Sequence, residues 1–341
     1  MTAHSSSFSR RGVLVATTAL GLSLAAGGIA FAAEVPATYQ GQNLRFMTSN
    51  GPGGGFDQYM RLVARYFTEV SGVATSAQNV EGAGGVIGDN DLYNARPDGL
   101  TIGLINFPGH AFNQILNAEG VQYDFGNWQW LGRVAGVAPA LAVRADSPIE
   151  TFADAVASPE PVRFGLEGRG SDAYYGTVFL HNLLDMPVQQ IVGYGGPGEI
   201  SAAMLAGEVD ARFESVDTLL PELQQGTLRI LVVFDSQRDP RLPDVPSLEE
   251  LGLDDETVAQ LEAFANIYKL ERSFVAPPDT PTENVEFLRT TLSEVFAHEE
   301  FQAALAAAGR SLAPMDGATL AEEAGKVAEQ MEELKPLFVE E

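Results

Sequence analysis

Residues 44–67, LRFMTSNGPGGGFDQYMRLVARYF, contain a short apolar strand, a glycine-rich turn and a helix in immediate succession. Residues 51–55 (GPGGG) interrupt the apolar run. The apolar residues that follow Asp57 recur at helical spacing. A glycine turn that opens a helix leaves backbone N–H groups without partners, and the helix dipole favours negative charge there. This stretch therefore predicts a seat for a carboxylate or a phosphate.

The same unit, a strand that ends in a glycine turn and continues as a helix, recurs along the chain. Further glycine turns occupy residues 82–88, 168–172 and 193–198. This alternation of strands and helices predicts an α/β fold with mainly parallel sheets. At 341 residues the chain is long enough for two domains with their own cores. We expect residues 34–143 and 270–341 to form domain 1, and residues 144–269 to form domain 2.

The charge balance restricts the class of partner. The chain has 20 Lys and Arg residues against 46 Asp and Glu residues, which gives a formal net charge of −26. So acidic a protein repels nucleic acids and anionic membranes, and we exclude both as main partners. The chain has no cysteine, so it can form neither a disulfide nor a thiolate metal site.

Residues 1–33 have the features of an export signal. Ser9 to Leu14 contain a twin-arginine pattern, an apolar run follows as far as Phe31, and residues 30–32 are a small-residue cleavage site. A membrane anchor is the alternative, but the run is rich in Gly, Ser, Thr and Ala. We therefore predict cleavage near Ala32 and Ala33, and a soluble protein exported to the periplasm by the twin-arginine route.

One motif suggests a different function. Gly193-x-Gly195-x-x-Gly198 fits the dinucleotide-binding fingerprint and follows a predicted strand. However, Pro197 removes a backbone N–H group from the turn, and acidic residues are too frequent here for a downstream acid to be informative. An exported nucleotide-dependent oxidoreductase is therefore the alternative function.

The sequence offers little support for catalysis. It contains no G-x-S-x-G elbow, no phosphate-binding loop with a lysine and no H-E-x-x-H motif. His110, His181 and His298 are far apart in the sequence, and we expect them to be ordinary surface or core residues. We predict no enzymatic activity, no metal and no cofactor.

Short glycine- and proline-containing segments follow one another in a set order over nearly the whole chain after residue 33. They are residues 52–57 (PGGGFD), Asn79 with 82–85 (GAGG) and Gly88, 97–101 (PDGLT), 147–148 (SP), 194–196 (YGG), 205–210 (LAGEVD), 242–249 (LPDVPSLE) and 276–281 (APPDTP). In this order they resemble the substrate-binding receptors of tripartite tricarboxylate transporters, also called the Bug family.

The resemblance implies a two-lobed periplasmic-binding-protein fold, type II-like, with the ligand in a cleft between two α/β domains. Family members bind small carboxylates, including di- and tricarboxylates, aromatic acids and some amino acids, and deliver them to a membrane permease. This chain departs from the family at Gly195, where Lys or Arg is common, and near residues 173–175, where His is common. The resemblance leads us to expect a monomer whose partners are a small carboxylate and a permease of the tripartite tricarboxylate type. A periplasmic sensor subunit is a further possibility.

The first domain is expected to bind the ligand mainly through its backbone. Asp57 either caps the helix or meets an ammonium or hydroxyl group of the ligand. Asn106 and Phe107 follow a predicted strand and are candidates for a polar contact and an apolar wall. The expected donors to one ligand oxygen, directly or through water, are the N–H groups of Gly54, Gly55 and Phe56.

The second domain is expected to hold the far end of the ligand. Arg169 is the most interesting cation, because a guanidinium group binds a carboxylate with two hydrogen bonds, although a surface ion pair explains it equally well. If Asp57, Asp172 and Glu214 all face the cleft, they repel a polyanion, so we favour a monocarboxylate or an amino-acid-like ligand over citrate. The remaining candidates are Gly170, Ser171, Tyr194, Gly195, Gly196 and Ser215.

Overall fold

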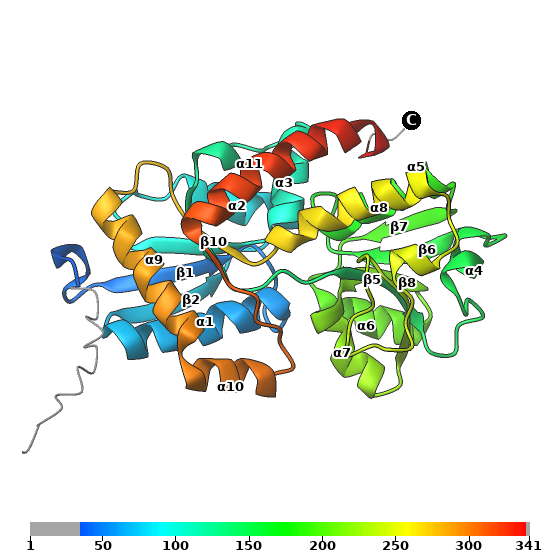
Figure 1. Ribbon diagram of the computed structural model, residues 1–341, viewed down its shortest axis with the longest axis horizontal. Coiled ribbons are helices and arrows are strands. Elements are labelled where there is room, and N and C mark those ends of the chain that lie inside the picture. The colour runs from blue at the N-terminus through cyan, green and yellow to red at the C-terminus, as the bar shows by residue number, and fades with distance from the viewer. Residues whose placement is uncertain (1–34, 339–341) are drawn as a thin grey trace, which may run out of the picture. The chain divides into compact units, whose positions relative to one another are not determined.

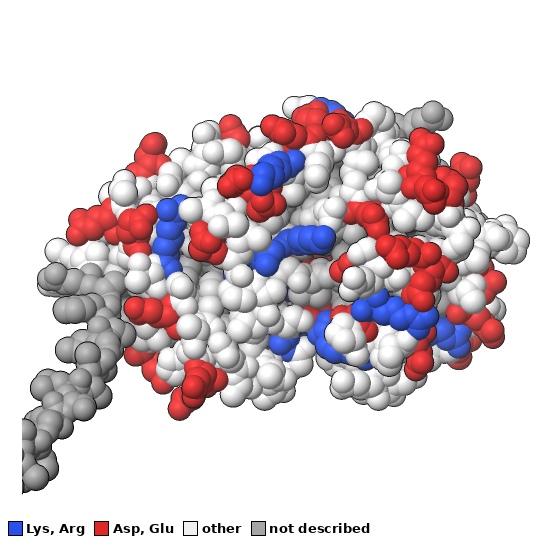
Figure 2. Space-filling model, in the orientation of Figure 1, with Lys and Arg blue, Asp and Glu red and all other residues white. Residues whose placement is uncertain are grey.

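The computed structural model describes residues 35–338 (Figure 1). The twin-arginine pattern and the predicted cleavage site lie outside the described residues. No helix in the described part of the chain combines the length and the apolar character that crossing a membrane requires. On the face shown in Figure 2, acidic side chains are spread over both halves, as the net charge of −26 predicts.

The first sheet has six strands in the order β11-β4-β10-β3-β1-β2. β1 pairs in parallel with β2 and β3, β10 runs antiparallel to β3 and β4, and β11 runs antiparallel to β4. The strands are β1 (Asn43–Thr48), β2 (Ala74–Asn79), β3 (Thr101–Ile105), β4 (Gln129–Arg133), β10 (Ser273–Ala276) and β11 (Met315–Asp316). The helices of this lobe are α1 (Gly55–Ser71), α2 (Val86–Tyr93), α3 (Phe107–Ile115), α9 (Thr282–Ala297), α10 (Glu299–Ala307) and α11 (Gly317–Leu334).

The second sheet has five strands in the order β7-β6-β8-β5-β9. β6 pairs in parallel with β7 and β8, and β5 runs antiparallel to β8 and β9. The strands are β5 (Pro139–Arg144), β6 (Val162–Leu166), β7 (Val188–Val192), β8 (Ala211–Ser215) and β9 (Leu228–Val233). The helices of this lobe are α4 (Phe152–Val156), α5 (Asp172–Leu184), α6 (Pro197–Ala206), α7 (Val216–Gln224) and α8 (Asp255–Ile267).

Both sheets are mixed. Four strands share one direction in each sheet, as the expectation of mainly parallel sheets has it, but β10 and β11 are reversed in the first sheet and β5 is reversed in the second. In each sheet the chain enters the central reversed strand, β10 or β5, from the other sheet. No helical crossover within the same sheet precedes such a strand, so nothing fixes it in the parallel direction. The predicted class, an α/β fold of two lobes, is confirmed.

The first crossing between the sheets is short. β4 ends at Arg133 in the first sheet and β5 begins at Pro139 in the second. The predicted boundary after residue 143 assigns most of β5 to domain 1, whereas its strand pairing favours a boundary between residues 133 and 139. The domain limits otherwise stay a prediction.

An aromatic cluster joins helices of both lobes. Phe112 of α3 lies 4.5 Å from Phe338, between ring centroids, and Phe338 lies 5.3 Å from Phe179 of α5. Phe179 in turn stacks on Phe264 of α8 at 4.4 Å. All four rings are buried. We call these residues the aromatic clasp, because the helical turn that carries Phe338 packs against the first lobe and the second lobe together.

Candidate functional site

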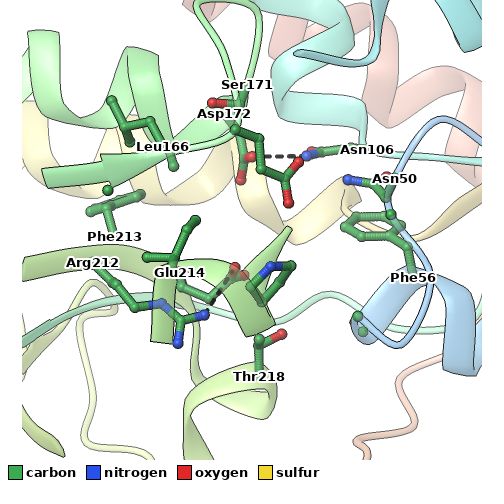
Figure 3. A pocket seen from close by; sticks show the side chains of 18 residues that line it. Asn50, Phe56, Asn106, Leu166, Ser171, Asp172, Arg212, Phe213, Glu214 and Thr218 are labelled. Atoms are coloured by element: carbon green, nitrogen blue, oxygen red, sulfur yellow. Dashed lines mark hydrogen bonds and ion pairs between the residues drawn. The ribbon is translucent and has the colours of Figure 1, made fainter. Parts of the chain in front are cut away.

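A cleft that is partly open to solvent lies where strands of both sheets end (Figure 3). The first lobe contributes the residues after β1 and β3, and the second lobe contributes the ends of β6 and β8 with the starts of α5 and α6. The carboxyl ends of strands are where α/β proteins usually bind ligands. The lining residues are Asn50, Gly51, Gly54, Gly55, Phe56, Asn106, Gly165, Leu166, Glu167, Ser171, Asp172, Ala173, Pro197, Ile200, Arg212, Phe213, Glu214 and Thr218.

The first-lobe wall is the N-terminus of α1. The Gln58 N–H group donates to the Gly54 carbonyl at 3.1 Å, which closes the first helical turn. The N–H groups of Gly55 and Phe56 precede this bond, so the helix itself supplies no acceptor for them. Because the positive end of the helix dipole lies at the same place, this wall is suited to a carboxylate.

A buried arginine strengthens the positive character of this wall. The guanidinium carbon of Arg272 lies 5.1 Å from the ring centroid of Phe56 and 4.9 Å from that of Tyr59. Arg272 Nη2 donates to Ser215 Oγ at 2.9 Å, and Nη1 pairs with Glu271. Arg272 therefore holds a positive charge directly behind the glycine turn. Its hydrogen bond engages the Ser215 hydroxyl on the side away from the cleft.

Asp57 has partners within its own turn. Its carboxylate accepts from the Gly53 N–H group at 2.9 Å and forms an ion pair with Arg61 at 2.8 Å. The side chain is buried and does not line the cleft. The N-cap of α1 is Gly54, so Asp57 neither caps the helix nor lines the cleft, and its carboxylate instead ties the glycine turn to the first helical turn.

The second-lobe wall is acidic. Glu167, Asp172 and Glu214 all line the cleft, and Asn106 Nδ2 reaches across from the first lobe to donate to Asp172 Oδ1 at 2.8 Å (Figure 3). Burial, reinforced by repulsion from Glu214, raises the pKa of Glu167 to about 8. The same causes raise the pKa of Asp172 to about 6. The surroundings of Glu167 and Asp172 thus do not offset the cost of burying their negative charges.

Arg212 is the cation of this wall, and it is not among the residues predicted from the sequence. Its Nη1 donates to Ser201 Oγ and to Glu222 Oε1, both at 2.8 Å, and its Nη2 lies 3.8 Å from Glu214 Oε2. The residue is only 1% exposed, and Nη2 is a buried donor with no hydrogen-bond partner among the described residues. The sequence did hold one signal for Arg212. Arg212 and Glu214 are charged residues at alternate positions of one strand, which places both on the same face of the sheet.

Seven predicted site residues line the cleft: Gly54, Gly55, Phe56, Asn106, Ser171, Asp172 and Glu214. Ser171 is also the N-cap of α5 and accepts from the Tyr174 N–H group at 3.2 Å. The other predicted residues lie outside the lining: Asp57, Phe107, Arg169, Gly170, Tyr194, Gly195, Gly196 and Ser215.

Two of the residues outside the lining were expected to have clear ligand roles. Phe107 is fully buried and packs against Phe125 and Trp130, so it belongs to the core of the first lobe. Arg169 is exposed and has no part in the cleft. The apolar wall comes instead from Phe56, Leu166 and Phe213, and the buried cation is Arg212.

The two lobes approach each other through glycines at the mouth of the cleft. A Cβ atom on Gly51 would lie 2.6 Å from the Gly195 carbonyl oxygen, and one on Gly84 would lie 2.6 Å from the backbone of Gly170. Asn113 Nδ2 also donates across this contact to the Gly170 carbonyl at 2.9 Å. The predicted turns 193–198 and 168–172 therefore form the rim of the cleft.

The structure offers no metal centre in the part that it describes, since no three His, Asp or Glu side chains are placed to hold an ion. His110 is fully buried in a hydrogen-bonded cluster with Asp89 and Trp128. It is therefore a core residue, in agreement with the expectation that the histidines are ordinary surface or core residues.

Residues 60–337 match the family model described as tripartite tricarboxylate transporter family receptor. Protein BugT of Bordetella pertussis is 29% identical over 239 residues, which cover 68% of this chain and 72% of BugT. A UPF0065 protein encoded in the gbd 5' region of Cupriavidus necator is 26% identical over 308 residues, which cover 87% of this chain and 86% of that protein.

Solved structures with the same fold include three close matches in shape. MatC from Rhodopseudomonas palustris with bound malate has a TM-score of 0.73 at 20% identity, covering 86% of this chain and 98% of MatC. The periplasmic binding protein BugD has a TM-score of 0.75 at 21% identity, covering 87% of this chain and 98% of BugD. Rpa4515 of R. palustris with adipate has a TM-score of 0.73 at 21% identity, covering 86% of this chain and 96% of that chain.

Proposed function

The chain belongs to the tripartite tricarboxylate transporter receptor family, and from this premise we propose that it captures a small carboxylate between its two lobes and delivers it to a membrane permease of the tripartite tricarboxylate type. This family consists of transport receptors and is not an enzyme family. Relatives in shape are described with malate and with adipate.

One observation carries the proposal. The N-terminus of α1 lines the cleft with Gly55 and Phe56, whose N–H groups have no acceptor within the helix, and Arg272 packs against both residues. We assign the ligand carboxylate to this wall, since backbone donors and a helix dipole recognise the charge without depending on the rest of the molecule. Asn50, Asn106 and Thr218 also line the cleft and are polar side chains available for a second contact.

The oxidoreductase alternative loses its main support. Pro197 begins α6, and the Glu199 carboxylate accepts from the Gly195 N–H group at 2.9 Å, so the turn supplies its own anion where a phosphate would bind. Export to the periplasm by the twin-arginine route, action as a monomer and the choice of permease are part of the proposal.

Thermal melting of the purified protein against a ligand panel tests the function. The panel contains mono-, di- and tricarboxylates, aromatic acids, amino acids, NAD and FAD. A ligand at about 100 times its dissociation constant adds about 2.7 kcal/mol to the free energy of unfolding, which gives a clear rise in Tm. We expect a rise with one class of carboxylate and none with nucleotides. A rise with NAD or FAD alone contradicts the receptor function.

A further inference from the structure

The geometry points to a ligand that carries an ammonium group beside a carboxylate: an α-amino acid, whose ammonium is held by Glu167 and Glu214 of the second lobe. This inference rests on the proposed function, because it takes the cleft as the carboxylate-binding site and names the chemical class of ligand within it.

The two walls of the cleft have opposite polarity. The first-lobe wall offers the positive end of α1 with Arg272 behind it. The second-lobe wall offers Glu167, Asp172 and Glu214. A dicarboxylate that spans the cleft would place one negative end against these acids, where like charges repel. A ligand with a positive group at that end is attracted to both walls.

Glu167 is the acid that lacks a partner. Asp172 accepts from Asn106, and Glu214 accepts from the Ser215 N–H group at 2.9 Å. In residues 35–338, no hydrogen bond or ion pair involves the Glu167 carboxylate, although it lines the cleft. A partly buried carboxyl without a partner is unfavourable, and a ligand ammonium with three N–H donors supplies what is missing.

Arg212 gives an independent indication of a ligand at the same wall. Its Nη2 is buried, has no hydrogen-bond partner among the described residues, and lies 3.8 Å from Glu214 Oε2. The wall therefore presents a charged donor next to charged acceptors. The ammonium group of an α-amino acid fits this wall, since it donates to Glu214 and Glu167 while the ligand carboxylate binds at the N-terminus of α1 on the other wall. A dicarboxylate has no donor for the acids.

Matched ligand pairs that differ by one ammonium group test the inference. Isothermal titration calorimetry of the whole protein would compare propionate with alanine, succinate with aspartate, and glutarate with glutamate. We expect the amino member of the pair whose length fits the cleft to bind at least tenfold more tightly. Equal or tighter binding by the plain carboxylate in every pair overturns the inference and leaves the receptor function standing. Binding by no member of any pair overturns the inference, and the wider melting panel then decides the receptor function separately.

Two substitutions test the residues. Glu167→Gln and Glu214→Gln keep the size and the acceptor oxygen but remove the charge, so each should reduce the preference for the amino member by tenfold or more. Glu160→Gln is the matched control, because Glu160 is an exposed acid just before the opposite end of β6. An unchanged preference in both cleft variants contradicts the assignment.

Proton release distinguishes direct contact from a structural role. Glu167 faces Glu214 and Arg212 of β8, Asp172 of α5 and Glu81 of the loop after β2, and its raised pKa of about 8 leaves it mostly protonated at pH 7. An ammonium group beside it lowers this pKa, so binding should release a proton at pH 7. Titrations in two buffers with different ionisation enthalpies measure the release. Proton uptake, or no exchange in the native protein, contradicts the contact, and Glu167→Gln should abolish the release.

Discussion

At the mouth of the cleft, Gly51 faces the carbonyl oxygen of Gly195 too closely for any side chain. A Cβ atom there would lie 2.6 Å from that oxygen. We therefore expect Gly51→Ala to keep the lobes apart and to lower the affinity for the ligand at least tenfold, which corresponds to about 1.4 kcal/mol. Calorimetric titration with the best ligand of the panel measures the effect.

The control for this variant is Gly198→Ala. Gly198 lies in α6 with no atom within 4 Å of its hypothetical Cβ, so alanine should leave the affinity unchanged. Alanine at such a helical position stabilises the fold by about 0.4 to 1 kcal/mol. If Gly51→Ala binds as tightly as the native protein, the contact with Gly195 is absent from the ligand-bound state.

His110 is held on both ring nitrogens. The Trp128 Nε1–H group donates to its Nε2 at 2.7 Å, so its Nδ1 carries the proton and donates to Asp89 Oδ2 at 3.0 Å. The ring also stacks on Tyr123 with centroids 3.7 Å apart. His110→Ala leaves a buried carboxylate and a buried N–H group unpaired, and should lower the free energy of unfolding by about 3 kcal/mol or more. Urea denaturation measures it, and a loss below about 1 kcal/mol contradicts the network.

Backbone sites could be predicted from the sequence better than side-chain sites. The turn of Gly54 and Gly55 is a local pattern, and it does open into the cleft. Arg212 and Glu167 could not be identified in the same way. Each lies in or directly after a strand, and which face of a strand meets a cleft depends on the neighbouring strands and on the other lobe. Arg169, which was chosen by its place in a glycine turn, is exposed.

At the scale of elements, the units of strand, glycine turn and helix fold as their local signals predict. β1 ends at Thr48 and β6 at Leu166, shortly before the glycine turns at residues 51–55 and 168–172. The direction of β5 and β10 could not be predicted, because it depends on the sheet that the chain enters rather than on the residues of the strand. The capping of α5 was also hidden, since Ser171 was interpreted only as a ligand contact.

Ser171 supports the start of α5 from both sides. Its Oγ accepts from the Tyr174 N–H group at 3.2 Å and donates to the Gly168 carbonyl at 2.8 Å. Ser171→Ala should lower the free energy of unfolding by about 1 kcal/mol, as the loss of a helix N-cap generally does. Ser171→Gly should lower it by only a few tenths. Equal stability of the alanine variant and the native protein in urea denaturation contradicts the capping role.

For the whole molecule, the buried acids predict a stability that falls as the pH rises. Burial raises the pKa of Glu167 and of Glu271 to about 8 from an ordinary 4.5, and that of Asp172 to about 6 from 3.8. The folded state therefore binds more protons than the unfolded state between these values, and this stabilisation is lost as the pH rises through about 6 to 8.

Melting of the ligand-free protein across this window checks the sign. The Tm should decrease between about pH 5 and pH 8, and Glu167→Gln should make the decrease smaller because one of the titrating groups is gone. Acids with lowered pKa, such as Glu250 at about 2, change their charge below this window and do not oppose the trend. A Tm that rises with pH over the same range contradicts the burial of these carboxyl groups.

Replacing an aromatic side chain of the clasp by alanine should strongly lower the free energy of unfolding. Phe338 contacts Phe112, Phe179 and Phe264 and is itself buried. Phe338→Ala should lower the free energy of unfolding by about 3 to 5 kcal/mol, the usual range for a buried phenylalanine. Pro336→Ala, at an exposed position of the same turn, is the control. Similar denaturation curves for the two variants contradict the role of the clasp.

The clasp also sets an order of events during protein synthesis. Phe338 follows every strand of both sheets in the chain, so each sheet can leave the ribosome and pair its strands before the residue that joins the lobes is available. A chain that stops early would keep both sheets and the hydrogen bonds of Asn106 and Asn113 between the lobes, but it would lack the contacts of Phe338. The sides of Phe112 and Phe179 that Phe338 covers would then face solvent, and exposed apolar surface of this kind is what chaperones and proteases recognise in unfinished proteins.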